Sequence, residues 1–253
     1  MKKSVAVTAA SVALIAITAG IVVSSFMLSR FMLKIQHSTE KKITVKGVAE
    51  KLVTSDVAAF SCSVEAKGKD RANGFKALEK NKKLFLAKLD SLGFTAAMRS
   101  DESISCEARY NTIRTKDAQG RENSTTQFSH YELSYSVRVC TSNVQLVARN
   151  VLKIHELNAQ GLEVNVESPR FYITNPEQFK LELVNAASYS AAQRAKTAAE
   201  HSGSTLGPLM EARQGVIQIT APASSDTSDE GMYDTRSVQK VIRMVMTMKF
   251  SLK

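Results

Sequence analysis

VIRMVMTMKFSLK, residues 241–253, is the clearest strand pattern in the chain and decides its fold class. Successive side chains of a β-strand point to opposite faces of the sheet. One face of this strand would therefore be apolar and the other polar. The apolar set is Ile242, Met244, Met246, Met248, Phe250 and Leu252, and the polar set is Arg243, Thr247, Lys249, Ser251 and Lys253. The pattern predicts a sheet with one dry face and one wet face.

The same period of two predicts further strands along the chain. Residues 104–110 and 131–139 form a long hairpin around a polar loop at 115–126. A strand at 43–47 is joined to a strand at 56–66 by a tight turn near Ser55. Shorter strands are predicted at 162–172 and 215–220, and a polar loop at 222–237 precedes the C-terminal strand.

Three segments change to the helical period of 3.6 residues. The first covers 70–92 and ends at Gly93, and the second covers 143–157. The third covers 176–202, with Pro176 in its first turn. Its stripe of small side chains, Ala187, Ala191, Ala195 and Ala198, predicts close packing of this helix on a sheet.

The order of these elements is β-β-α-β-β-α-β-α-β-β. Hairpins interrupted by helices predict an α+β fold, in which a largely antiparallel sheet built from β-hairpins carries helices on one face. A doubly wound parallel sheet would instead alternate single strands with helices. The predicted folded domain covers residues 43–253.

The N-terminal segment predicts one transmembrane helix ahead of this domain. Ser4–Ser29 is a run of 26 residues without a charge between Lys3 and Arg30. A bilayer span needs about 20 apolar residues, whereas the apolar region of a cleavable signal peptide has about 7–15. We therefore expect an uncleaved signal-anchor at 1–35 and a linker at 36–42. The charges that flank the run do not settle its orientation.

The formal net charge of +10 does not indicate a nucleic-acid partner. The 34 basic and 24 acidic residues are interspersed, and no basic stripe alternates with aromatic residues. Three scattered cysteines do not predict a disulfide framework or a zinc site. The four histidines stand far apart, at His37, His130, His155 and His201. We predict no nucleic-acid, metal or cofactor partner.

Sequence motifs also predict no catalytic residues. Nucleophile-elbow, P-loop and dinucleotide-binding motifs are absent from the sequence. The acidic loop with Asp226, Asp229, Glu230 and Asp234 lacks the spacing of a calcium loop. Cys140 is the one candidate for redox chemistry, because it falls on a polar strand face near a helix start. Cys62 and Cys106 fall on apolar faces, where we expect burial against the helices.

Several short segments together resemble the SIMPL-domain (DUF541) proteins. The segments are Ile43–Gly47 followed by Ser55-Asp56, Gly93-Phe94 leading into Asp101, Tyr110, Tyr131–Leu133, and the helix with Ala187, Ala191 and Ala195 that leads to Leu206-Gly207. The resemblance covers nearly all of residues 43–253. It implies an α+β fold, the bacterial periplasm or outer cell envelope, self-association in some members, and an association with oxidative or envelope stress. It supplies no catalytic residues.

Two functions from different classes remain open. The first is a non-enzymatic, membrane-anchored envelope protein whose sheet edges and apolar C-terminal strand mediate self-assembly or the binding of an envelope protein. The second is an envelope enzyme or thiol-redox protein that uses Cys140. A concave pocket with converging titratable groups would favour the enzyme. A flat or grooved surface would favour the interaction protein.

Overall fold

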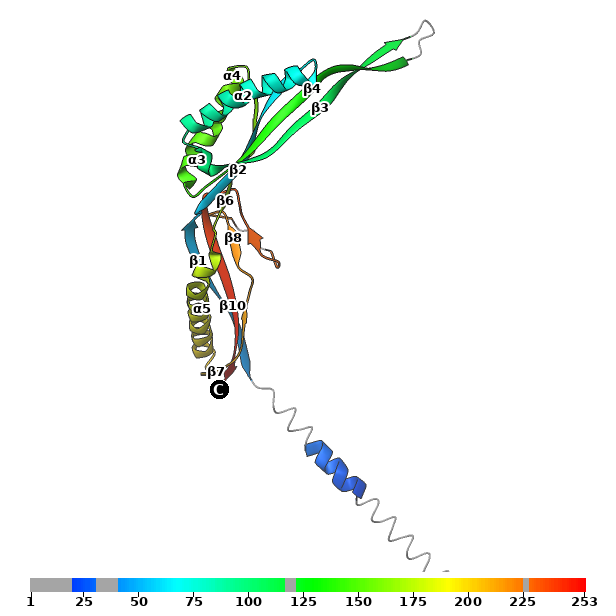
Figure 1. Ribbon diagram of the computed structural model, residues 1–253. Helices are drawn as coiled ribbons and strands as arrows, with labels where there is room; N and C mark the ends of the chain where they lie inside the picture. The colour runs from blue at the N-terminus through cyan, green and yellow to red at the C-terminus, as the bar shows by residue number, and fades with distance from the viewer. Residues whose placement is uncertain (1–19, 31–40, 117–121, 225–227) are drawn as a thin grey trace, which may run out of the picture. The chain divides into compact units, whose positions relative to one another are not determined.

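The computed structural model describes residues 20–30, 41–116, 122–224 and 228–253 (Figure 1). The chain divides into two compact units. The first contains residues up to Val48, Ala186–Gly215 and Val245–Lys253, and the second contains Ala49–Asn185 and Val216–Met244. Two five-stranded sheets hold the described strands together. We call them the β10 sheet and the β2 sheet.

Strand β10 (Gln239–Leu252) organises the β10 sheet. It pairs with β1 (Lys42–Thr54) and runs antiparallel to both β7 (Leu206–Gln214) and β8 (Gln218–Thr220). The short strand β9 (Met232–Tyr233) lies parallel to β8. The dry face predicted for β10 is confirmed, because Ile242, Met244, Met246, Met248 and Phe250 are all buried.

Helix α5 (Lys180–His201), which follows a 3-10 turn at Pro176–Phe179, carries the predicted stripe of alanines. Ala187, Ala191 and Ala195 are fully buried. The stripe continues to Ala199 rather than to Ala198, which is exposed. On β1, a Cβ atom added to Gly47 would lie 2.0 Å from the carbonyl oxygen of Ala187. Helix and strand backbones therefore touch at this glycine, which explains why the facing helix residues are small.

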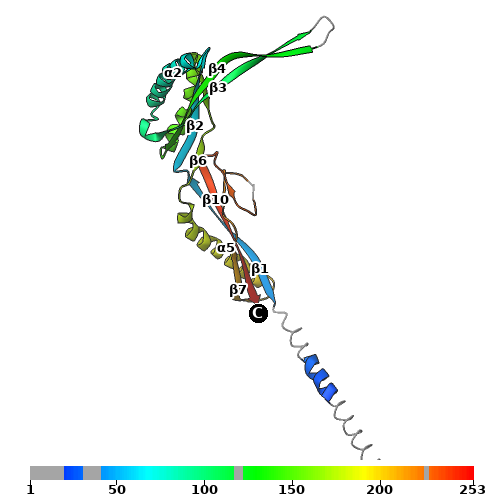
Figure 2. The ribbon, with the colours of Figure 1, turned by 45° about the vertical axis from the view of Figure 1, so that its right-hand side comes forward.

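Strand β2 (Val57–Gly68) is the central strand of the β2 sheet. One edge pairs with β4 (Glu122–Thr141), and the other edge pairs with β5 (Glu163–Val166) and β6 (Arg170–Tyr172). Beyond β4 lies β3 (Arg99–Lys116), and all of these pairings are antiparallel. In Figures 1 and 2, β3 and β4 continue side by side beyond the end of β2. We call this two-stranded extension the β-arm.

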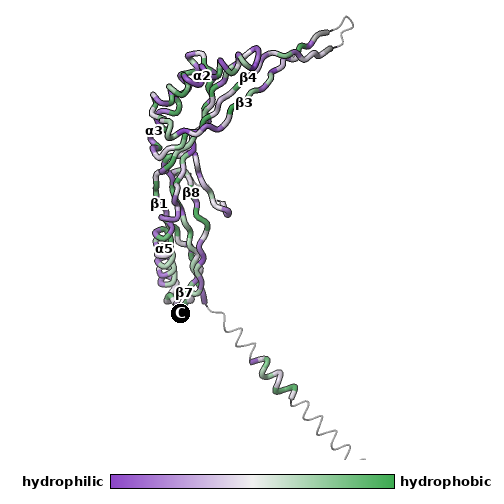
Figure 3. The backbone as a smooth tube through the Cα atoms, viewed as in Figure 1, coloured by the Kyte–Doolittle hydropathy of each residue, from purple (hydrophilic) through white to green (hydrophobic). Residues whose placement is uncertain are grey.

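Helix α2 (Arg71–Ser91) covers the dry face of the β2 sheet. Asp70 caps its start by accepting a hydrogen bond from the backbone N–H of Asn73 at 2.9 Å. The core beneath it joins α2 to alternate residues of β2 and β4. It contains Phe60, Cys62, Val64, Leu78, Phe85, Leu89, Leu133, Tyr135 and Val137. Figure 3 shows hydrophobic and hydrophilic residues alternating along these strands.

The second predicted helix is present but divided. It consists of α3 (Val144–Asn150), a 3-10 helix at Val151–His155, and α4 (Glu156–Ala159). The buried residues in these pieces, Val144, Val147, Val151, Ile154 and Leu157, are three or four positions apart. A 3-10 turn places residues at i and i+3 on one side. Both Val151 and Ile154 can therefore reach the same core.

The prediction of a single sheet is wrong, because β1 and β2 belong to different sheets. The residues between them bind distant segments instead of closing a hairpin. The N–H of Ser55 donates to the carbonyl of Val238, and the N–H of Asp56 donates to the carbonyl of Tyr172, each at 2.9 Å. The α+β class and the mainly antiparallel pairing are confirmed.

Three smaller predictions also need correction. The hairpin ladder continues to the pair Lys116 and Glu122, so much of the predicted loop at 115–126 is strand, while 117–121 lie outside the described residues. The strand predicted at 162–172 is interrupted at 167–169. Strand β7 and the short strand β9 were not predicted.

Most of the predicted anchor at 1–35 and linker at 36–42 lies outside the described residues. Residues 20–30 are helical. Within the described ranges, none of the helices combines the length and apolar character needed to cross a membrane.

Neighbouring residues of β10 should respond very differently to the same substitution. Met246 is 7% exposed, so Met246→Asp buries a carboxylate without a partner and should lower the free energy of unfolding by about 3 kcal/mol or more. Thr247→Asp on the wet face should cost less than about 1 kcal/mol. Chemical denaturation of both variants measures the difference, and equal losses would contradict the dry and wet faces assigned to β10.

Candidate functional site

The structure separates the three cysteines. Cys62 is buried, as predicted. Burial is the main cause that raises the pKa of its thiol to about 12, and the nearby Glu102 carboxylate adds to it. Arg99 has a smaller, opposing effect on this pKa. Cys140 is exposed and pairs with Ala59 on the wet face of the β2 sheet, as its register predicted. The predicted burial of Cys106 is wrong. It lies beside Leu133 on the dry face, but on the edge strand β3, outside the core that α2 covers.

The residues weighed for catalysis or metal binding do not come together. Within the described ranges, the Cys140 thiol has no hydrogen bond or ion pair, and no group of three or more His, Cys, Asp or Glu side chains could hold a metal ion. His130 contacts its neighbour Ser129. In the acidic loop, the Asp234 carboxylate accepts hydrogen bonds from Ser237 and from the N–H of Arg236.

Asp234 instead neutralises a buried lysine. Lys240 is fully buried, and its ammonium donates to the carbonyl oxygens of Asp234 at 2.5 Å and Ser237 at 2.7 Å. Burial lowers the pKa of Lys240, although the Asp234 carboxylate acts in the opposite direction. Burial would raise the pKa of Asp234, but the hydrogen bonds from Ser237 and the backbone together lower it. This pair fixes the loop before β10.

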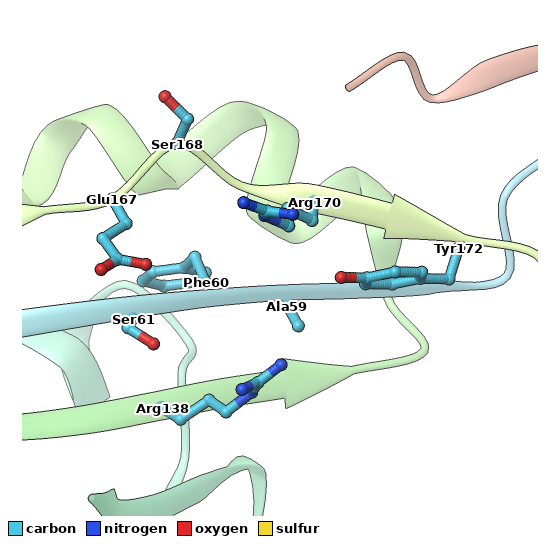
Figure 4. Close-up of a pocket in the computed structure, with 8 residues that line it drawn as sticks. All are labelled: Ala59, Phe60, Ser61, Arg138, Glu167, Ser168, Arg170 and Tyr172. Atoms are coloured by element: carbon cyan, nitrogen blue, oxygen red, sulfur yellow. The ribbon is translucent and has the colours of Figure 1, made fainter. Parts of the chain in front are cut away.

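A pocket of about 300 Å³ opens on the wet face of the β2 sheet (Figure 4). It lies where β5 and β6 are interrupted, so that the chain from Glu167 to Arg170 arches beside β2. The small side chain of Ala59 leaves room at its centre. The lining residues are Ala59, Phe60, Ser61, Arg138, Glu167, Ser168, Arg170 and Tyr172.

The strand register explains how two arginines meet at this pocket. Ser61 pairs with Arg138 on β4, and Ala59 pairs with Arg170 on β6. Residues 59 and 61 point to the same face, so the two arginines rise on one face from opposite sides of β2. The sequence pattern gives no sign of this pair, because each arginine alone looks like an ordinary exposed strand residue.

The pocket is chemically suited to binding rather than to acid–base catalysis. Arginine remains protonated in proteins and cannot exchange protons at neutral pH. The Ser61 hydroxyl donates to Glu102 at 3.2 Å, and no histidine or cysteine lines the pocket. A pair of nucleophile and base, which hydrolytic catalysis would need, is therefore not formed by the lining residues.

A second candidate surface lies along β3. This edge strand pairs on one side with β4, and in the described part of the chain no strand pairs with its other side. Apolar side chains stay exposed along it and along the β-arm. Ile104 is 53% exposed, Tyr110 59%, Ile113 45% and Phe128 40%. Tyr110 and Phe128 stack edge to face with their ring centres 5.9 Å apart.

Comparison with known proteins gives a family but no activity. A family model described as SIMPL, protein of unknown function (DUF541), matches residues 43–250. None of the curated proteins matches the chain.

Two solved structures are distantly similar. A "putative amidohydrolase/peptidase" from Burkholderia cenocepacia shares 10% identity at a TM-score of 0.23, over 55% of this chain and 32% of that one. A "putative aminohydrolase" from methicillin-resistant Staphylococcus aureus shares 13% sequence identity at a TM-score of 0.21. This match covers 53% of this chain and 33% of that one. The chain thus spans about a third of each, and likeness this low carries no argument.

Maleimide labelling of the native protein should modify Cys140 and Cys106 and spare Cys62. Both modified thiols are exposed, whereas Cys62 is buried and its raised pKa leaves almost no reactive thiolate below pH 9. Mass spectrometry of peptides identifies each site. Labelling of Cys62 before Cys140 in the folded protein would contradict the register of β2 and β4.

Proposed function

The chain belongs to the SIMPL (DUF541) family, and we propose that it is a non-enzymatic envelope protein that works by binding protein chains, beginning with a second copy of itself, through β3. Its N-terminal segment would hold it in the bacterial cell membrane as a single-pass anchor, with the folded part facing the periplasm or the cell exterior. The observation that carries the binding proposal is the uncovered edge of β3.

An edge strand of 18 residues is an open template for another strand. Natural proteins usually protect such edges, and a two-stranded ribbon by itself is only marginally stable in water. Here the dry side of the strand is also left uncovered, with Ile104 and Tyr110 in contact with solvent. A further strand laid along β3 would satisfy its free backbone groups and bury these side chains together.

The charges along β3 favour a second copy as the added strand. Its first half carries Arg99 and three acidic residues, Asp101, Glu102 and Glu107, and its second half carries Arg109 and Arg114. Within one chain, Glu107 binds Arg109 at 3.1 Å. Two copies of β3 that pair antiparallel about Ala108 would place Glu107 beside Arg109 of the second copy. A two-fold interface uses the same surface on both chains, so its charge pattern has to be self-complementary in this way.

The dry face of β10 is not available for the same role. Its methionines are buried within the chain, so we assign the proposed interface to β3 instead of this strand. The thiol alternative gains no further support, because Cys140 has no base or partner thiol bonded to it in the described part of the chain.

A cysteine placed at the centre of the proposed pairing should join two copies. With Cys106 and Cys140 replaced by serine, Ala108→Cys should form a disulfide-linked dimer on mild oxidation of the full-length protein in detergent, because residue 108 of one copy would face residue 108 of the other. The geometry of directly opposed strand residues is close to that of a disulfide. Non-reducing electrophoresis measures the product.

The matched control is Thr112→Cys in the same background. Off the centre, residue 112 would face residue 104 of the second copy and should give little dimer. Equal cross-linking of the two variants, or a monomeric mass of the unmodified protein by light scattering at every concentration, would contradict the proposal. Tyr110→Ser should lower the mass, whereas Tyr189→Ser, which removes an aromatic ring 68% exposed on α5, should not.

The anchor proposal has a separate test. The uncharged run is longer than a cleavable signal peptide needs, so protein extracted from the membrane should retain its first 35 residues. Intact-mass measurement and N-terminal sequencing give the result. A mature N-terminus at or after Gln36 would show that the segment is a cleaved signal.

A further inference from the structure

In the pocket on the wet face of the β2 sheet, neither of the two guanidinium groups is held by a close ion pair. Arg138 reaches Glu102 only at 3.9 Å, with its side chain 53% exposed. Within the described residues, the Arg170 guanidinium has no ion pair or hydrogen bond. Two cations flank one strand, and their mutual repulsion falls when an anion lies between them.

The remainder of the same sheet face is different, because its cations are bound by carboxylates at short distance. Lys67 binds Glu163 at 2.6 Å, and Arg109 binds Glu132. Glu65 has its pKa raised by burial and then by the carboxylates of Glu132 and Glu163. Guanidinium groups without a close ion pair are therefore a local property of the pocket, not a general property of the face.

The pocket also has a polarity from one end to the other. Figure 4 shows the Tyr172 hydroxyl and the Arg138 guanidinium directed toward Ala59, while the Glu167 carboxylate lies at the end near Ser61. Guanidinium groups bind carboxylates through two parallel hydrogen bonds. A carboxylate at the opposite end accepts from an ammonium group. A simple anion would leave Glu167 without a partner and would lie near its negative charge.

We propose that this pocket binds a small zwitterion of the amino-acid or dipeptide class. The two arginines hold its carboxylate, with the Tyr172 hydroxyl as a further donor, and Glu167 accepts from its ammonium group. The volume of about 300 Å³ is at the lower end of the range for small-molecule sites, which suits a ligand of this size. None of the lining residues belongs to β3, so binding to the pocket can be tested separately from the proposed assembly.

Calorimetric titration of the full-length protein in detergent tests the assignment with related probes. L-alanyl-L-alanine should bind. The dipeptide with a C-terminal amide should bind much more weakly, because it lacks the carboxylate. The N-acetylated dipeptide should lose less affinity than the amide does. Arg138→Gln and Arg170→Gln should each weaken dipeptide binding by about tenfold or more, because a charge-assisted pair is removed. Glu167→Gln should weaken the dipeptide but leave the N-acetyl form unchanged.

Arg149→Gln is the matched control. Arg149 is an exposed arginine on α3, whose Val144 and Val147 belong to the core on the opposite face of the sheet. Its substitution should leave the affinity unchanged, and thermal denaturation should show that all four variants fold. Absence of dipeptide binding to the unmodified protein, or equal weakening by Arg149→Gln and Arg170→Gln, would overturn the proposal. Tighter binding of inorganic phosphate than of the dipeptide would also overturn it.

Cys140 supplies a second, local readout, because it pairs with Ala59 at the centre of the pocket. In a Cys106→Ser background it is the exposed thiol that remains. The dipeptide should slow its reaction with maleimide at the concentrations that saturate the calorimetric signal. An unchanged rate in the presence of bound dipeptide would contradict the placement of the ligand at the Ala59 end of the pocket.

Discussion

The register of β2 is the constraint on which the second unit depends. This strand is paired on both edges, with β4 on one side and β5 and β6 on the other, so its alternation is imposed on three neighbours at once. A shift by one residue would exchange the two faces of a strand. Such a shift would expose Phe60 and bury Ser61, and it would remove Ala59 and Ser61 from the face that carries Arg138 and Arg170. The hydrophobic core and the pocket are thus two results of one register.

Local periodicity predicted most elements of this chain but not their partners. Period two located β10 and the β3–β4 hairpin, and helical spacing located α2 and α5, because these signals depend on neighbours a few residues apart. Pairing depends on distant segments. Strand β1 directly precedes β2 in sequence, yet other strands occupy both edges of β2. The partner of β1 is therefore β10. No local pattern contains that information.

The difference between local periodicity and long-range pairing also explains why the exposure of Cys106 and the arginine pair of the pocket were not predicted. Cys106 has the alternation of a buried residue, but burial also requires a helix above it, and α2 lies over β2 and β4 rather than over the edge strand. Arg138 and Arg170 lie 32 positions apart in sequence and meet because both pair with β2. The uncovered edge and the charged pocket are therefore properties of sheet order. Composition could exclude several chemistries, but it could not locate a surface.

The contact at Gly47 has a mechanical consequence if the N-terminal segment holds the chain in a membrane. Any pull then enters the folded part near Lys41, whose carbonyl accepts a hydrogen bond from the N–H of Leu252 at 2.7 Å. A force directed along β1 loads its hydrogen bonds to β10 in shear, so that several must break together. Because the backbone of α5 touches β1 at Gly47, sliding the strand would drive the next side chain into the helix. The close backbone contact at Gly47 thus resists extension near the point where the tether would act.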